Sequence, residues 1–260
     1  MKIKRFHQFV HRERGAVQTA VIDFLKGNIY QVSNDILEAF DKKNYDKIPE
    51  FIEKANQEDL LIEVDEKIWV PCITFDTFRT NNEESTFNLV LEDGVDLDLV
   101  QRTLRHFQIS TVYYCGDLNR LKTYFPYSRI VPMKKDFQQC LALNHVTGEF
   151  SKIKESFYVF NMLFNSCWGK KVTITRDGKI RLCLHSEIII GTLDEGNFYE
   201  VMDKIKDYWI LTKDKVEKCK SCELRYVCFD CREIPRRHSH KLCAGNPYCK
   251  YDPLYGTWAE

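Results

Sequence analysis

Cysteine placement constrains this chain more than any other feature of its sequence. Eight of its eleven cysteines lie from residue 167 onward, and four of these form two Cys-x-x-Cys pairs separated by the segment ELRYV. A Cys-x-x-Cys turn brings two thiolates to one ion or cluster, and thiolates select soft metals such as zinc, copper(I) or the iron of iron–sulfur clusters. The sequence therefore predicts a metal-binding region built from Cys167, Cys183, Cys219, Cys222, Cys228, Cys231, Cys243 and Cys249.

The length and charge of the chain limit its domain number and its charged partners. The 260 residues leave room for one large domain or several small ones, and Lys plus Arg equals Asp plus Glu at 38 each, so no overall field favours nucleic acid or an anionic membrane. The N-terminus lacks an apolar run of signal-peptide length, and no stretch approaches the roughly 20 apolar residues of a spanning helix. We expect a cytoplasmic protein without a membrane partner, in which clustered thiols are metal ligands rather than disulfides.

The first part of the chain, residues 1–70, has the pattern of a small α+β unit. Two alternating segments meet at Gly27-Asn28, a pair that suits the tight turn of a β-hairpin. Ser33 is placed to cap a following helix, and Pro49 is placed to begin a second one. The alternating segment LLIEVDEKIWV then closes the unit as a strand.

The rest of the chain divides into two parts. Residues 71–166 alternate strand and helix patterns, which predicts parallel βα pairing, but they are too few for an eight-fold barrel of about 250 residues. The sequence therefore predicts a partial barrel or a short open sheet for this stretch. Residues 167–260 hold the cysteine-rich region, with a hairpin turning at Asp177-Gly178, one helix around FYEVMDKIKDYW, and irregular structure in which bound metal supplies folding energy.

One longer pattern joins these cysteines to a glycine. Cys167-x10-Gly178-x4-Cys183, followed by both Cys-x-x-Cys pairs and a distal cysteine, resembles the SPASM domain of radical-SAM peptide maturases. That family usually has three residues within the last pair, whereas this chain has two. The resemblance implies two auxiliary [4Fe-4S] clusters. One would be held by a first cysteine set, Cys167, Cys183 and Cys231, with Cys243 as candidate fourth ligand or, alternatively, with an open coordination site filled by substrate. The other would be held by a second cysteine set, Cys219, Cys222, Cys228 and Cys249.

A charged residue stands between the two Cys-x-x-Cys pairs. Arg225 could donate hydrogen bonds to cluster sulfurs and so raise a reduction potential, which would make it a cofactor-binding residue. A salt bridge is the alternative interpretation. Zinc is likewise the alternative to iron–sulfur, because paired Cys-x-x-Cys motifs also build zinc ribbons, and His185, His238 and His240 are near enough in sequence to replace a thiolate.

The first part also has a counterpart in known families. With VIDFLKGNIYQVSNDILEAF at its centre, it resembles the winged-helix element by which peptide-modifying enzymes hold a leader peptide, and such elements add the peptide as a strand to a sheet edge. The segments CELRYVCFDCR and NPYCKYDPLYGTW resemble maturases of grasp-with-spasm systems, in which an ATP-grasp ligase and a short precursor peptide are neighbours.

The central motif of radical-SAM enzymes is missing from this sequence. Their S-adenosylmethionine cluster uses three cysteines spaced Cys-x3-Cys-x2-Cys, and this chain has no such triplet. Cys72, Cys115 and Cys140 are scattered and are better interpreted as buried thiols. No S-adenosylmethionine site is recognised, so the middle part resembles a degenerate radical-SAM barrel, and whether the protein is itself an enzyme stays open.

Two functions of different classes follow. The first is maturation of a ribosomally synthesised precursor peptide, with the leader bound by the N-terminal unit and the iron–sulfur region used for substrate positioning or electron transfer. The second is a non-enzymatic, zinc-stabilised adaptor that presents peptide to an ATP-grasp ligase. Nucleic-acid binding is disfavoured because the N-terminal helices lack a basic recognition face and the net charge is zero.

Overall fold

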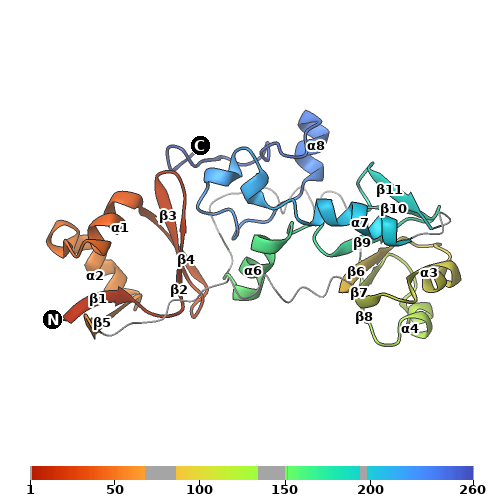
Figure 1. Ribbon diagram of the computed structural model, residues 1–260, viewed down its shortest axis with the longest axis horizontal. Coiled ribbons are helices and arrows are strands. Elements are labelled where there is room, and N and C mark those ends of the chain that lie inside the picture. Colours follow the sequence, from red (N-terminus) through yellow and green to blue (C-terminus); the bar gives the residue numbers. More distant parts are fainter. Residues whose placement is uncertain (1, 68–85, 134–149, 151, 194–197, 260) are drawn as a thin grey trace.

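The computed structural model describes residues 2–67, 86–133, 150, 152–193 and 198–259. It is a mixed α/β structure in which the N-terminal unit and a six-stranded sheet lie at opposite ends, with helix α6 (Glu155–Leu163) and the cysteine-rich segment between them (Figure 1). None of the helices in these described ranges combines the length and the apolar character needed to cross a membrane.

The N-terminal unit contains two antiparallel sheets and two helices. Three strands form one sheet in the order β2-β3-β4, and the first and last strands of the unit form the other. The elements are β1 (Lys2–Phe6), β2 (Val10–Arg14), β3 (Gln18–Asp23), β4 (Asn28–Ser33), α1 (Asn34–Asp41), the 3-10 turn η1 (Tyr45–Lys47), α2 (Pro49–Gln57) and β5 (Leu61–Asp65).

Local sequence signals explain several of these elements. The predicted hairpin is confirmed as β3 and β4, and its turn ends at Gly27, whose φ of 73° lies in the left-handed region that favours glycine. Ser33 caps α1, with its side-chain oxygen accepting the backbone N–H of Asp35 at 3.3 Å. Pro49 begins α2 as predicted. The closing strand exists as well, but it pairs with β1, and the winged-helix assignment stays a prediction.

The three-stranded sheet has an apolar layer on each face. Val21 belongs to a cluster with residues of α1 and α2, whereas Ala20 and Ile22 belong to a cluster with α6 and the cysteine-rich segment. Successive residues of a strand point to opposite faces, so the alternation along β3 places these two clusters on opposite sides. The N-terminal unit is therefore packed directly against the cysteine-rich region.

The six-stranded sheet combines segments from both sides of the predicted boundary at residue 166. The predicted parallel pairing is confirmed for β6, β7 and β8, and β9 joins β6 in parallel from beyond that boundary. The sheet is open, in the order β11-β10-β9-β6-β7-β8. Its elements are β6 (Thr86–Leu91), α3 (Leu97–Leu104), β7 (Gln108–Tyr114), η3 (Leu118–Arg120), α4 (Leu121–Tyr124), β8 (Arg129–Pro132), β9 (Lys171–Ile174), β10 (Lys179–Arg181), β11 (Ile189–Thr192) and α7 (Phe198–Trp209).

The main core lies on this sheet, and the cysteine-rich segment continues from it. Leu89, Leu91 and Val172 are fully buried in one cluster with Ile205 and Trp209 of α7, which confirms the predicted helix. The predicted β9–β10 hairpin is also confirmed, with its turn at Asp177-Gly178. After α7 the chain is mostly irregular, with short elements η4 (Lys213–Lys215), η5 (Cys219–Ser221), α8 (Glu233–Ser239), β12 (Tyr251–Asp252) and β13 (Thr257–Trp258).

Candidate metal centre

The three thiols of the first cysteine set come from distant parts of the chain and lie together. Cys167 follows α6, Cys183 follows β10, and Cys231 precedes α8. A hydrogen bond with the Cys167 thiol, together with burial, raises the pKa of Cys231 well above the usual range of a thiol. Burial raises the pKa of Cys183 to about 12, with a smaller contribution from the nearby Cys231. The structure therefore groups the three cysteines that the resemblance assigns to one cluster.

The second cysteine set is grouped in the same way. The turn η5 brings Cys219 and Cys222 close, with the Cys222 N–H bonded to the Cys219 carbonyl at 2.9 Å. Burial raises the pKa of Cys219 to about 11 and also raises that of Cys222, and the neighbouring Cys228 adds to both effects. Cys249 packs with Cys222 against the same apolar cluster. The thiols of Cys219, Cys222 and Cys228 thus lie near one another, and Cys249 lies against the same apolar cluster as Cys222.

The thiols of each cysteine set lie near one another, but they are not arranged closely enough to coordinate a metal ion together. Within the described residues, no group of three or more His, Cys, Asp or Glu side chains is arranged to hold a metal ion, and the cysteines form no disulfides with one another. The donor chemistry nevertheless fits a thiolate-bound centre, because each set is made of partly or fully buried sulfurs. Their raised pKa values mean that metal binding would release protons from these thiols.

Cys243 is the candidate fourth ligand of the first site. It is exposed, and its carbonyl accepts the backbone N–H of Glu217 at 3.0 Å, two residues before Cys219. Its backbone therefore stands beside the start of the second set. The role of Cys243 as fourth ligand of the first site stays a prediction.

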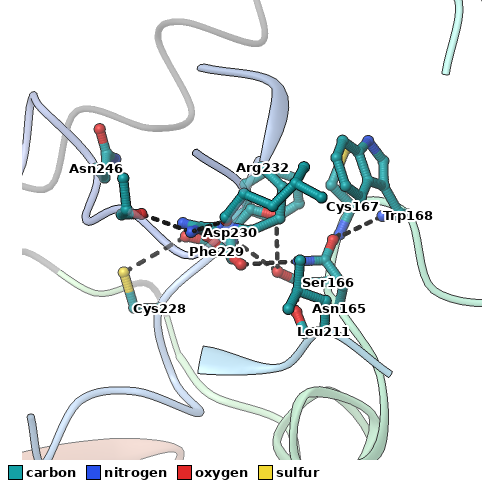
Figure 2. Close-up of polar contacts among 12 residues, drawn as sticks. Asn165, Ser166, Cys167, Trp168, Leu211, Cys228, Phe229, Asp230, Arg232 and Asn246 are labelled. Atoms are coloured by element: carbon teal, nitrogen blue, oxygen red, sulfur yellow. Dashed lines mark hydrogen bonds and ion pairs between the residues drawn. The ribbon is translucent and has the colours of Figure 1, made fainter. Parts of the chain in front are cut away.

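A buried polar network connects the loops that carry the two sets (Figure 2). Asn165 accepts the N–H groups of Cys167 and Trp168 at 2.9 and 2.8 Å and donates to the carboxylate of Asp230 at 2.7 Å. Arg232 donates to the same carboxylate from Nε at 2.9 Å and from a second nitrogen. Asp230 follows Cys228 closely and directly precedes Cys231, so the network holds the ligand-bearing loops in a fixed relation.

Sequence reasoning missed this network because its charged members look like surface residues. Arg232 belongs to a basic run that also contains Arg236 and Arg237, yet Arg232 is 0% exposed and Asp230 is 3% exposed. Arg236 and Arg237 both pair with the buried Glu233. The apparent basic patch is therefore largely neutralised within the fold.

Arg225 contacts the N-terminal unit. Its guanidinium pairs with Glu13 and donates to the carbonyls of Arg14 and Cys222 at 3.1 and 2.8 Å. The salt bridge considered from sequence is thus present, in a partly buried setting. A hydrogen bond from Arg225 to a sulfur is not among these contacts, and its role at a cofactor stays a prediction.

One more charged residue lies close to the second cysteine set. Lys213, at the start of η4, is only 7% exposed. Burial alone would lower the pKa of its ammonium group, but the nearby Cys228, Cys219 and Asp230 outweigh that effect and raise it. No sequence motif marks this residue, since isolated lysines usually lie in solvent.

The candidate histidine ligands lie in different places, and only His185 lies beside one of these cysteines, since its backbone is hydrogen-bonded to the Cys183 thiol. His238 and His240 are exposed around the end of α8, and His185 contributes its backbone carbonyl to Arg237. Cys115 directly follows β7, whereas Cys72 and Cys140 lie outside the described residues.

A separate concave site lies in the N-terminal unit. A groove of about 750 Å³ runs between β4 and α2. Ile48, Ala55 and Leu60 give it a buried apolar lining. Charged side chains of both signs also line it, namely Lys47, Glu50, Lys54 and Glu58.

No protein-family model matches the chain, and no curated protein matches its sequence.

Proposed function

We propose that this protein takes part in the maturation of a ribosomally synthesised precursor peptide. The groove between β4 and α2 would hold the peptide's leader, and the cysteine-rich region would hold two [4Fe-4S] clusters that position the substrate or transfer electrons. The observation that carries the proposal is the combination of this groove with an open strand edge. The grouping of the two cysteine sets supports the second half.

The groove has the features that strand addition needs. Among the described residues β4 pairs only with β3, so its other edge offers backbone donors and acceptors to an incoming strand. Tyr30 and Val32 line the groove from β4, and Ile36 lines it from α1. Backbone hydrogen bonds would supply affinity, and alternate side chains of the peptide would enter the apolar lining. The mixed charges at the groove suit a peptide that is not strongly acidic or basic.

The same strand reaches the cysteine-rich region on its other face. Gln31 of β4 donates to Glu223 at 2.6 Å and to the hydroxyl of Tyr251 at 3.0 Å. Glu223 directly follows Cys222, and Tyr251 lies two residues after Cys249. A peptide added beside β4 would therefore lie next to the loops of the second cysteine set.

The chain's own residues would have distinct tasks in this function. The two cysteine sets would hold clusters, which supply one-electron transfer when bound. The network of Asn165, Asp230 and Arg232 would keep the cluster-bearing loops in place, and the N-terminal unit would orient the peptide. We assign no bond-breaking or bond-forming step to the protein.

Peptide binding tests the proposal directly. The full-length protein is titrated, with fluorescence anisotropy as the readout, into labelled synthetic peptides that correspond to short reading frames beside its gene. Ile36→Lys places a charge in the apolar groove and should weaken binding about tenfold or more. Ile62→Lys on β5, also half-buried but outside the groove, is the matched control. If no such peptide binds, or if both variants bind equally well, the groove is not the leader site.

A zinc-stabilised adaptor that presents peptide to an ATP-grasp ligase is the second candidate. It is favoured by the same observation that supports the clusters, because sets of buried thiols also bind zinc. Measuring iron, acid-labile sulfide and zinc after anaerobic purification distinguishes the zinc-stabilised adaptor from the cluster-containing maturation protein. Zinc without sulfide would make the region a scaffold, and sulfide in amounts equal to iron would support clusters.

A further inference from the structure

A second groove lies on the six-stranded sheet, at the end of the molecule opposite the N-terminal unit. It has a volume of about 800 Å³ and lies between the end of α3, the start of β7 and the loop that joins α4 to β8. Figure 1 shows α3, α4 and β8 together at this end. We call it the arginine groove, because Arg102 and Arg105 are the only charged residues among the described residues that line it.

The positive charge of the arginine groove is not neutralised by the fold. Arg102 and Arg105 are exposed, and within the described residues neither forms an ion pair with a carboxylate. Arg105 donates from Nε to Nε2 of His106 at 2.8 Å. Asp98, one turn before Arg102 on α3, is hydrogen-bonded instead to the hydroxyl of Tyr124. Both guanidinium groups are therefore available to an anionic partner.

Aromatic side chains line the groove beside the arginines. Tyr127 is fully exposed, and Phe107 lies against Tyr199 of α7, with the ring centroids 5.0 Å apart. Tyr199 is itself 58% exposed. Surfaces that bind other proteins are enriched in aromatic residues and arginine and depleted in lysine, aspartate and glutamate. The arginine groove has the composition of such a surface.

Hydrogen bonds hold the walls of the arginine groove in place. Gln101 donates to the carbonyl of Tyr124 at 3.2 Å and so joins α3 to α4. Ser128 donates to the carbonyl of Ile109 at 2.7 Å and so joins the loop before β8 to β7. A groove that is already formed costs a partner less ordering entropy than one that forms on binding.

These features favour an acidic peptide segment over a phosphate-bearing small molecule. Phosphate sites typically use the backbone N–H groups of glycine-rich loops or of helix N-termini. None of the described residues that line this groove is glycine, and the helix end beside it is the C-terminus of α3. Carboxylates pair directly with guanidinium groups. An acidic segment that also carries an apolar side chain matches both the charge and the aromatic wall.

We propose that the arginine groove is a docking surface for an acidic segment of a partner protein. Carboxylates of that segment pair with Arg102 and Arg105, and one of its apolar side chains packs against Phe107 and Tyr127. The inference goes beyond the proposed function and does not depend on it, because the arginine groove shares no lining residue with the groove between β4 and α2 and contains no cysteine.

A purely structural role for the two arginines predicts a different outcome. Cations near a helix C-terminus interact favourably with the helix dipole, and Arg102 lies in the last turn of α3. If this were their whole role, replacing them would lower the melting temperature and leave binding unchanged. A docking role predicts the reverse.

Fluorescence anisotropy with the full-length protein and two labelled short peptides tests the proposal. The acidic probe alternates glutamate with leucine and tyrosine, and its counterpart has lysine at every glutamate position. The variants are Arg102→Gln combined with Arg105→Gln, and Tyr127→Ala. Arg120→Gln is the matched control, because Arg120 is an exposed arginine of η3 outside the groove. Ile36→Lys reports whether the probe enters the groove between β4 and α2 instead.

We expect the acidic probe to bind the wild type and the lysine counterpart not to bind. The double arginine variant should weaken binding about tenfold or more, and added salt should weaken wild-type binding because it screens exposed charges. Tyr127→Ala should weaken binding about fivefold at an unchanged melting temperature, because the exposed side chain makes few contacts in the free protein. Arg120→Gln and Ile36→Lys should match the wild type.

Several results would overturn the proposal. They are equal binding of the two peptides, unchanged binding in the double arginine variant and in Tyr127→Ala, or a loss in Ile36→Lys as large as in the double variant. Equally strong competition by inorganic pyrophosphate would make the groove a simple anion site. Tyr127→Ala keeps the test decisive if the double variant fails to fold.

The chain's own acidic residues supply one more control. Glu83 and Glu84 precede Thr86, a lining residue of the arginine groove, in the sequence. If the probe binds only when both are replaced by glutamine, the groove is filled by this chain and the partner proposal is wrong. If leader peptides fail to bind while the acidic probe behaves as expected, only the maturation proposal fails.

Discussion

Replacing Arg232 by methionine should lower the free energy of unfolding by about 3–5 kcal/mol, the usual cost of removing one partner from a buried ion pair. The side chain is 0% exposed and donates to the Asp230 carboxylate and to the carbonyls of Leu242 and Ala244, the latter two at 3.1 and 2.7 Å. Methionine would occupy much of the volume but supply no donor. The buried carboxylate would keep its hydrogen bond from Asn165 and the nearby charge of Lys213, but it would lose both of its hydrogen bonds from Arg232. Because the total free energy of unfolding of a domain is about 5–15 kcal/mol, this loss would be a large fraction of the protein's stability.

Urea unfolding of the full-length protein, followed by circular dichroism at matched metal content, measures the effect. Arg237→Met is the control, since that arginine is 40% exposed and its pair with Glu233 should contribute less than about 1 kcal/mol. The double variant Arg232→Met, Asp230→Asn should recover part of the loss, because the unpaired carboxylate is gone. A loss below about 1 kcal/mol for Arg232→Met, or no recovery in the double variant, would refute the reasoning.

Three further predictions concern the core, the interface and the first cysteine set. Leu89→Ala, at a fully buried position of β6, should cost about 2–5 kcal/mol in urea unfolding, and a cost under about 1 kcal/mol would contradict the core packing described. Burial works against the charged form of Glu13, but hydrogen bonds from His11 and Tyr158 and the charge of Arg225 outweigh it and lower its pKa below the ordinary 4.5. The ionised carboxylate therefore stabilises the fold above about pH 4.5, and this contribution is lost as the pH falls through the lowered pKa. Glu13→Gln should flatten that part of the acid-unfolding profile, and an unchanged profile would argue against the pair. Cys231→Ala should remove the metal of the first cysteine set and leave the second site filled, which metal analysis per chain would show. Loss of the metal from both sites together would contradict the division into two separate sets.

Much of the local structure was predictable because its causes are local. The turn at Gly27, the cap at Ser33 and the start of α2 at Pro49 depend on the backbone preferences of a few residues. The hairpin at Asp177-Gly178 is of the same kind. These positions appear in the structure where the sequence predicts them.

The remaining features depend on contacts between distant segments. Nothing near β9 in the sequence indicates that it pairs in parallel with β6, and the expected division at residue 166 therefore crosses one sheet. Lys213 and Arg232 look like ordinary surface cations until burial is known. The grouping of Cys167, Cys183 and Cys231 was expected only from a resemblance, since three single thiols from three segments carry no spacing of their own.

The pairing of β6 with β9 also sets an order for folding during synthesis. When β6, β7 and β8 have left the ribosome, Leu89 and its neighbours in β6 still present an unpaired edge until Val172 and the rest of β9 have been made. An open apolar strand edge invites pairing with other chains. The interval between the synthesis of the two strands makes the nascent chain vulnerable to aggregation at this edge, and the first strand of the cysteine-rich region has to emerge before this edge of β6 is covered.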